Sequence, residues 1–162
     1  NKKIMGFRMK IHQSIVSNEL IKQFPTDFPI ELSLTNFVAN CVGLEAVLAC
    51  SALFCPEIIE IDGVIYRSEN NDQKVYPNDS YGTDKKTLEM ASNVFPISQF
   101  FLMEDDRASD DYMLITVFSE VIKYFWNIRL KSLYPNKKFE FIITDDGLYG
   151  EEGFCMTFYE VE

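Results

Sequence analysis

The sequence predicts an α+β domain in which two β-hairpins form one four-stranded antiparallel sheet and helices cover one face of that sheet. Three observations support this prediction: an Asp-Gly pair between two β-rich runs, a long stretch with helical apolar spacing, and alternating apolar residues near the C-terminus. The chain has 162 residues, which suits a single domain spanning 1–162. Its apolar content of 47% is enough for a core of its own.

The first 30 residues give mixed signals. Apolar and polar residues alternate over 7–12, which is a strand pattern, whereas apolar residues recur at helical spacing toward Phe24. We expect a helix over the second half of 7–24 that ends at Pro25, because proline has no amide donor. Whether residues 1–30 add a strand to the sheet stays open.

The middle of the chain predicts a helix followed by a hairpin. Residues 35–55 carry one apolar stripe at helical spacing, with Gly43 as a break or bend, because glycine is unfavourable in a helix interior. Over residues 57–68, two β-rich runs flank Asp62 and Gly63. An Asp-Gly pair favours a type I′ turn, whose two central residues both need positive φ, and therefore predicts a tight hairpin.

Two further helices are predicted before the last hairpin. Residues 84–94 form a short one, and residues 109–133 form the longest one in the chain, with a capping Ser-Asp-Asp sequence at its start. The long helix has such a broad apolar face that we expect it to be buried against the sheet and a neighbouring helix together. Its main stripe comprises Leu114, Val117, Phe118, Val121, Phe125 and Ile128, and Ile115, Ile122, Trp126 and Leu133 widen it.

The last hairpin is predicted from alternation over 139–144, a glycine-containing loop over 145–153 and a strand over 154–161. We expect the outward face of the sheet to be apolar enough to form a contact surface, and a homodimer through this face or through the helix that carries Trp126 is one alternative. The residues expected on that face are Tyr66, Ile142, Tyr159 and Val161.

Charge limits the partners that the protein can have. There are 25 Asp and Glu against 15 Lys and Arg, which gives a formal net charge of −10. This charge argues against nucleic acid, since neutralising phosphates requires a basic surface, and against an anionic membrane. It favours a basic protein partner, although acidity also serves solubility alone.

The four cysteines fit buried free thiols of a cytoplasmic protein. Each lies in an apolar run, and no C-x-x-C pair is present, so zinc or thioredoxin-like chemistry has little support. No apolar run is long enough to span a bilayer, which needs about 18 residues, and no secretory signal follows the basic start. We therefore expect a cytoplasmic protein without a metal or other cofactor.

No catalytic residue is assigned. His12 is the only histidine, and a general base needs a partner that the sequence does not supply. The acidic loops lack the regular Asp spacing of a calcium-binding loop. A pair of carboxylates of the glycosidase type cannot be singled out either, because a chain with 25 acidic residues offers many such pairs. The alternative function that stays open is a small hydrolase or small-ligand binder that uses carboxylates and tyrosines in a pocket.

Contact with a protein partner is expected at two acidic clusters and at tyrosines near strand and loop ends. Acidic side chains would speed the encounter, and tyrosine is enriched at interface hot spots. The residues expected to bind the partner are Glu104, Asp105, Asp106, Asp145, Asp146, Tyr149, Glu151, Glu152 and Tyr159.

The second half of the chain resembles a group of small, acidic bacterial α+β proteins without an assigned activity. Residues 52–67 (ALFCPEIIEIDGVIYR) and 124–161, which include YFWNIRLKSLYPNKKFEF and GFCMTFYEV, carry the likeness. In size, acidity and layout the chain also resembles immunity proteins of bacterial toxin systems. The second likeness implies a non-enzymatic binding module that inhibits a basic toxin.

Overall fold

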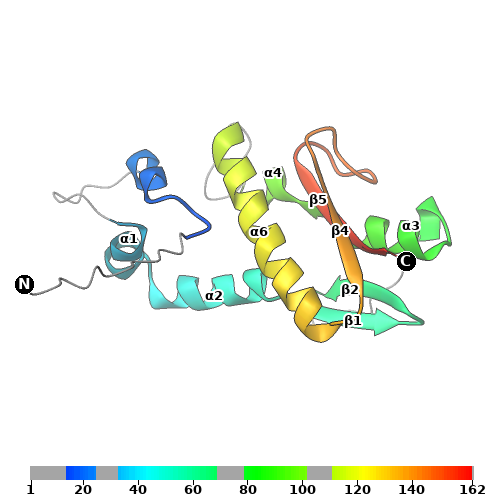
Figure 1. Cartoon of the computed structure of the whole chain (residues 1–162). Coiled ribbons are helices and arrows are strands. Elements are labelled where there is room, and N and C mark those ends of the chain that lie inside the picture. The colour runs from blue at the N-terminus through cyan, green and yellow to red at the C-terminus, as the bar shows by residue number, and fades with distance from the viewer. Residues whose placement is uncertain (1–13, 25–32, 69–78, 102–110, 162) are drawn as a thin grey trace, which may run out of the picture. The chain divides into compact units, whose positions relative to one another are not determined.

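The computed structural model of the chain describes residues 14–24, 33–68, 79–101 and 111–161 (Figure 1). The chain divides into two compact units, Asn1–Cys41 and Val42–Glu162.

Over its described residues, 14–24 and 33–41, the smaller unit contains two short helices, η1 (Asn18–Gln23) and α1 (Leu34–Cys41). A 3-10 helix, η1, takes the place of the α-helix expected before Pro25, and Phe24 ends it with extended backbone. The rings of Phe24 and Phe37 meet edge-on at 5.1 Å between centroids. The strand pattern over residues 7–12 lies outside the described residues.

The larger unit begins with α2 (Leu44–Phe54), so the predicted break at Gly43 is confirmed. The predicted hairpin follows as β1 (Glu57–Ile61) and β2 (Val64–Ser68), paired in antiparallel register from Glu57↔Ser68 to Ile61↔Val64. Asp62 and Gly63 have φ values of 51° and 81°, as a type I′ turn requires.

The described elements in the rest of the larger unit are η2 (Asp79–Tyr81), α3 (Lys85–Ser92), β3 (Phe95–Pro96), α4 (Ile97–Phe100), α6 (Tyr112–Leu133), β4 (Lys138–Thr144) and β5 (Cys155–Val161). The predicted helices and strands of this region are found with bounds shifted by a few residues, as α3, α6, β4 and β5, while η2, β3 and α4 were not predicted. Local side-chain caps start the two main helices of this region. Asp84 accepts from the backbone N–H of Thr87, and Asp111 accepts from two N–H groups in the first turn of α6.

The chain is α+β, but the prediction of one four-stranded sheet is wrong. Among the described residues the strands form two sheets, one of β1 and β2 and one of three strands in the order β3-β5-β4. β4 pairs with β5 along its whole length, and β3 pairs with β5 at Phe95↔Met156 and Pro96↔Cys155. The two hairpins therefore do not pair with each other.

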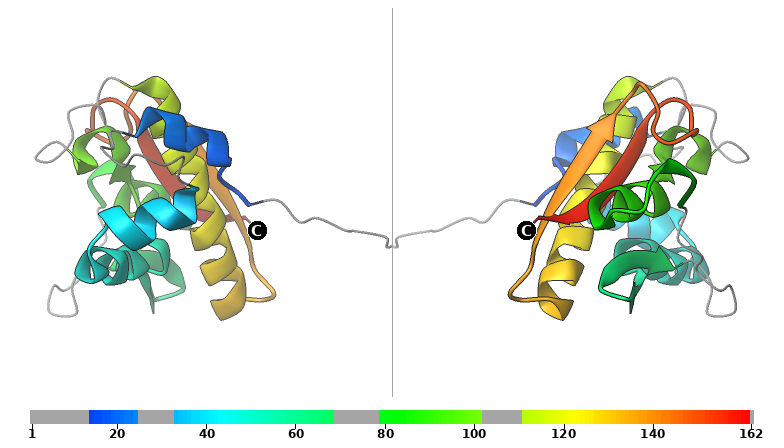
Figure 2. Two further views of the ribbon diagram at one scale, coloured as in Figure 1. Left: turned by 90° about the vertical axis from the view of Figure 1, so that its left-hand side faces the viewer. Right: turned by 90° about the vertical axis from the view of Figure 1, so that its right-hand side faces the viewer.

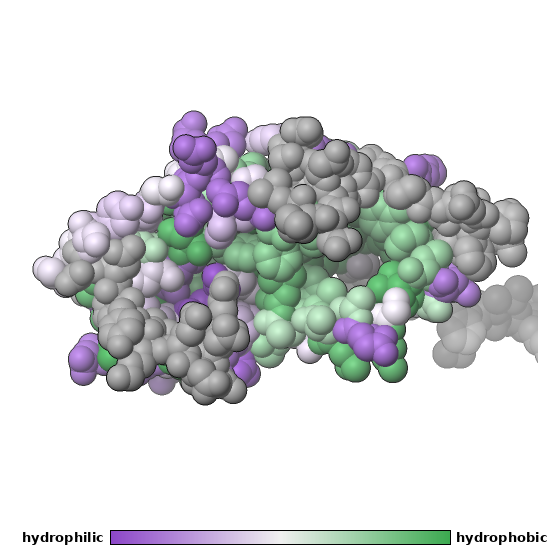
Figure 3. Space-filling view, turned by 180° about the vertical axis from the view of Figure 1, so that it is seen from behind, coloured by the Kyte–Doolittle hydropathy of each residue, from purple (hydrophilic) through white to green (hydrophobic). Residues whose placement is uncertain are grey.

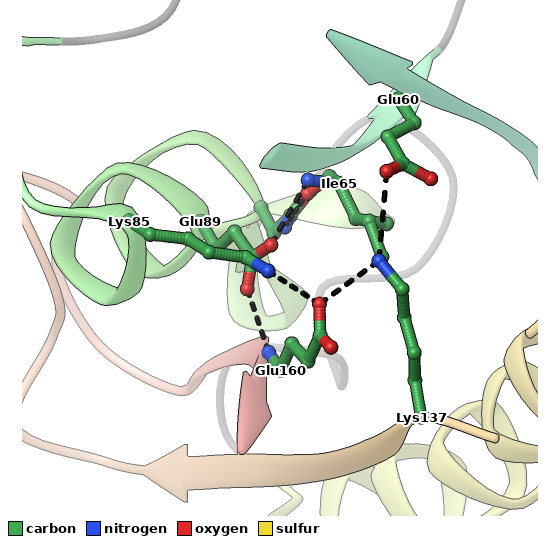
Figure 4. A network of polar contacts seen from close by, with 7 residues as sticks. Glu60, Ile65, Lys85, Glu89, Lys137 and Glu160 are labelled. Carbon is green, nitrogen blue, oxygen red and sulfur yellow. Dashed lines mark hydrogen bonds and ion pairs between the residues drawn. The ribbon is translucent and has the colours of Figure 1, made fainter. Parts of the chain in front are cut away.

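Side chains at the C-terminal end of α3 occupy the place where β2 would have paired with β5. The Glu89 carboxylate accepts from the backbone N–H of Ile65 on β2 at 3.0 Å and of Glu160 on β5 at 2.6 Å (Figure 4). The Asn93 side chain accepts from Arg67 N–H at 2.7 Å and donates to Ile65 C=O at 2.8 Å. Buried backbone groups need partners, and here two side chains supply them in place of a strand.

The core lies between α6 and the strands. In Figure 2, β4 and β5 lie between α6 and α3. Only one stripe of α6 is buried, so the expectation that its whole apolar face is covered is wrong: Phe125 and Ile128 are 37% and 47% exposed. The buried stripe comprises Ile115, Ser119, Ile122, Trp126 and Leu130.

The exposed apolar sheet face that the sequence predicted is not found, because two of its four residues are buried. Tyr66 is 1% exposed and Tyr159 is 7% exposed, because α3 and its side chains cover the strands there. Ile142 and Val161 are half-buried. Within the described ranges, no helix combines the length and apolar character that crossing a bilayer requires.

Candidate functional site

The loop between β4 and β5 holds four of the predicted contact residues on the surface. Asp145, Asp146, Glu151 and Glu152 are all exposed. The loop is tied by its own backbone: Gly147 N–H donates to Gly153 C=O at 3.0 Å, and residues 148 and 151 exchange two hydrogen bonds of 3.0 and 2.9 Å. Four carboxylates are thus presented on a closed loop.

Tyr149 braces this loop. Its carbonyl oxygen accepts from the Tyr81 hydroxyl at 2.6 Å, and the two rings meet edge-on at 5.0 Å. Tyr149 has a positive φ of 50°, which is uncommon for a residue with a side chain. Burial raises the pKa of the Tyr149 hydroxyl. The structure therefore gives the half-buried Tyr149 a role in holding the loop to η2.

Of the other predicted contact residues, the structure describes Tyr159, and it does not lie with the loop. Tyr159 lies in the interior, donates its hydroxyl to the Glu140 carboxylate, and has the Lys86 ammonium 4.2 Å from its ring centroid. The remaining predicted contact residues, Glu104, Asp105 and Asp106, and also His12, lie outside the described residues.

Glu89 and Glu160 form a carboxylate pair that the sequence analysis missed. Burial raises the pKa of the Glu89 carboxyl, and hydrogen bonds from the Glu160 and Ile65 N–H groups oppose that rise. Burial would also raise the pKa of Glu160, but its contacts with Lys85 and Lys137 outweigh burial and lower it (Figure 4). Both oxygens of Glu89 already accept backbone hydrogen bonds, so this carboxylate serves the fold.

A cavity of about 460 Å³ lies in the larger unit, between α2, the β1–β2 hairpin, β3 and α6. Its lining is mostly apolar and aromatic, with an arginine, a carboxylate, a hydroxyl and a thiol. The lining residues are Ala49, Ala52, Leu53, Cys55, Pro56, Glu57, Arg67, Ser68, Phe95, Phe100 and Trp126.

Two side chains of the cavity are firmly positioned. The Trp126 indole N–H donates to Leu53 C=O at 2.8 Å, which joins α6 to the end of α2. The guanidinium carbon of Arg67 lies 5.2 Å from the ring centroid of Phe95 and 5.3 Å from that of Trp126, which is cation–π distance. Alternation along β2 gave no hint of this stacking, because it depends on residues 28 and 59 positions away.

The four cysteines form no disulfide. All four are free, and the expectation of burial holds for Cys155 alone, since Cys41, Cys50 and Cys55 are exposed. Burial raises the pKa of the Cys155 thiol, which makes it a weak nucleophile. In the part of the chain that the structure describes, no three His, Cys, Asp or Glu side chains are placed to hold a metal ion.

Comparison of the chain with protein-family models, with curated proteins and with solved structures found no match.

Proposed function

We propose that the protein is a non-enzymatic binding module that contacts a protein partner through α2. The observation that carries this proposal is the make-up of α2: among its eleven residues Glu45 is the only charged one, and none of the eleven is buried. Leu44, Val47 and Leu48 are 69%, 40% and 61% exposed. Burying a leucine side chain is favourable by roughly 1.5–3 kcal/mol, so such a helix gains much from a covering partner.

The surroundings of α2 extend this apolar surface. Seen from behind, the side of the larger unit on which α2 lies carries a broad area of apolar residues (Figure 3). At the C-terminal end of α2, the Phe54 ring meets Phe125 of α6 at 5.1 Å, and Tyr124 and Ile128 are each 47% exposed. Aromatic and large apolar residues gathered on a surface are typical of protein-binding sites.

Charge complementarity supports a basic partner. The chain carries a net charge of −10, and the β4–β5 loop presents four carboxylates on a closed backbone. Such a field speeds the encounter with a positively charged protein, while the apolar contact provides the affinity. In its sharper form, the proposal is that the partner is the basic domain of a toxin, which the protein inhibits by covering it.

The hydrolase alternative has less support. That alternative needs several carboxylates and tyrosines in one pocket, whereas the described residues that line the cavity beside Trp126 include one carboxylate, Glu57, and no tyrosine.

The test is capture from a lysate of the organism that produces the protein, with three baits compared by quantitative mass spectrometry at low and high salt. The baits are the wild type, the α2 variant Leu44→Ser/Leu48→Ser, and Leu133→Ser, a control at a leucine that is 40% exposed on α6. We expect one basic protein that the wild type and the control retain and that the α2 variant loses. At high salt less of it should be captured, because screening slows its association.

Two results would overturn the proposal. One is equal retention of the same proteins by all three baits, which would show that α2 makes no contact. The other is a wild-type dimer in sedimentation velocity that the α2 variant dissociates, which would show that a second copy of the chain covers α2.

A further inference from the structure

The strand β4 forms an open edge of the three-stranded sheet. It is the outer strand in the order β3-β5-β4, and Figure 2 draws it in orange beside β5. In an antiparallel ladder, every second residue directs its N–H and C=O groups away from the neighbouring strand. Among the described residues, the backbone of β4 forms hydrogen bonds only with β5, so these outward groups are unpaired.

The shape of β4 leaves this edge suited to a further strand. Its register with β5 runs without a bulge from Lys138↔Val161 to Thr144↔Cys155, and its sequence, KFEFIIT, contains no proline. It has seven residues, whereas strands of about five or six are the most common. Proteins protect open edges with bulges, prolines or short strands, so a long, regular and largely apolar edge is a template for pairing.

The charges at the two ends of β4 are opposite in sign. Lys138 is exposed at the start of the strand, and Asp145 and Asp146 are exposed directly after its end. Among the described residues, none of these three side chains takes part in an ion pair. Glu140, the other charged residue of the strand, accepts from the Tyr159 hydroxyl and is thereby held toward β5. A strand that runs antiparallel with the same sequence would therefore bring a basic end against an acidic end.

We propose that the occupant of this edge is a second copy of the chain, whose β4 pairs antiparallel with the first about a two-fold axis at Phe141. This register overlaps the whole of β4 and places Lys138 opposite Thr144 of the second copy, beside its Asp146. Opposite charges on neighbouring strands stabilise the pairing, and the two-fold axis makes each such contact occur twice. The inference goes beyond the protein contact proposed for α2 and uses none of the residues of that helix.

The same register also continues the apolar side of the sheet. Phe139, Phe141 and Ile143 are half-buried and pack against the core of their own chain. In the paired strands, Phe139 lies opposite Ile143 of the second copy, and the two Phe141 side chains lie opposite each other. Pairs of aromatic and β-branched residues across strands are favourable, so the apolar contacts and the charges support one register.

Two measurements on the full chain test the proposal. Sedimentation velocity over a range of protein concentrations measures the association, and amide hydrogen exchange at low and high concentration locates it. We expect the wild type to change from monomer to dimer as its concentration rises. In the dimer, every second amide of β4 should exchange more slowly, because its N–H then donates to the second copy.

Charge-reversal variants at exposed positions test the register without disturbing the fold. Lys138→Glu should weaken the dimer by about tenfold, because two attractive contacts become repulsive. Asp146→Lys should weaken it by a similar factor, although this change makes the acidic chain less acidic. The double variant Lys138→Glu/Asp146→Lys restores both contacts with exchanged signs and should recover the wild-type affinity. Lys131→Glu, at an exposed position in the last turn of α6, changes the net charge as Lys138→Glu does and is the matched control.

Several results would overturn the proposal. A wild type that stays monomeric at every concentration, with unchanged exchange in β4, would show that the edge does not pair with a second copy. Failure of the double variant to recover the affinity, or an equal loss in Lys131→Glu, would overturn the register. Protection of the β4 amides only when a captured protein partner is added would assign the edge to that partner instead.

The result is separate from the test of the α2 contact. A dimer formed through β4 should persist in the variant Leu44→Ser/Leu48→Ser, because that variant leaves β4 unchanged. A dimer that dissociates in this variant, with unchanged exchange in β4, would overturn the pairing proposed for this edge.

Discussion

Replacing Asn93 by alanine should destabilise the protein strongly, although the change removes only a few atoms. The Asn93 side chain is fully buried and lies between β2 and β5. It accepts from Arg67 N–H at 2.7 Å and donates to Ile65 C=O at 2.8 Å and, more weakly, to Phe158 C=O at 3.4 Å. Alanine cannot replace any of these bonds.

The size of the effect follows from the backbone groups that lose their partners. Each buried polar group left without a hydrogen bond costs about 1–3 kcal/mol. Arg67 N–H and Ile65 C=O both face α3, so we expect Asn93→Ala to lower the free energy of unfolding by about 4 kcal/mol. Asn93→Asp should cost at least as much at neutral pH, because it places a buried carboxylate against the Ile65 carbonyl oxygen.

Urea denaturation followed by Trp126 fluorescence measures this change. With a slope of about 2 kcal/mol per M urea, the midpoint should fall by about 2 M. Asn136→Ala, at an exposed turn, is the matched control and should change stability by less than about 0.5 kcal/mol. Hydrogen exchange at the Arg67 amide should become faster in Asn93→Ala. A loss below about 1 kcal/mol with an unchanged Arg67 exchange rate would refute the idea that α3 side chains join the two sheets.

Three further changes should have measurable effects. Because the pKa of Glu160 is lowered in the folded state, its ionised carboxylate stabilises the fold above the unfolded-state pKa. This stabilisation is lost as the pH falls through the folded-state pKa. In urea titrations, Glu160→Gln should therefore lose less free energy of unfolding between pH 7 and pH 3 than the wild type does. Gly147→Ala should lower the melting temperature by several degrees, because Gly147 has a φ of 79° and a Cβ there would run into the Glu151 carbonyl oxygen; an unchanged melting temperature would contradict the loop geometry. Trp126→Phe should cost about 1–3 kcal/mol in thermal unfolding, since it leaves the Leu53 carbonyl oxygen without its donor; a neutral effect would show that this bond does not hold α2.

Local signals in the sequence predicted the elements well. The Asp62-Gly63 turn, the break at Gly43 and the cap at the start of α6 all depend on backbone conformations or contacts within a few residues. Such preferences act within one turn or one hairpin, so a single sequence contains the information needed to find them.

The site could be predicted only in part. The four carboxylates of the β4–β5 loop are exposed as expected, because a polar, glycine-containing loop lies on the surface, where water solvates its polar groups. The cavity could not be predicted, since its lining comes from α2, both strands of the first hairpin, β3, α4 and α6. The hydrogen bonds of Glu89 and Asn93 to the strands were not predicted either, although the spacing of four residues places both side chains on one face at the end of α3.

The sequence by itself determined most of the local elements, the register of the first hairpin at its turn, and the net acidity of the chain. Tertiary structure alone decided which of two apolar stripes on α6 is buried, and it inserted α3 between hairpins that the pattern would have paired. The physical reason is that apolar periodicity indicates which face of a helix or strand is favourably buried, but it does not indicate which other element covers that face. The contacts that fix this packing, such as Glu89 with Glu160 and Trp126 with Leu53, join residues 71 and 73 positions apart in the sequence.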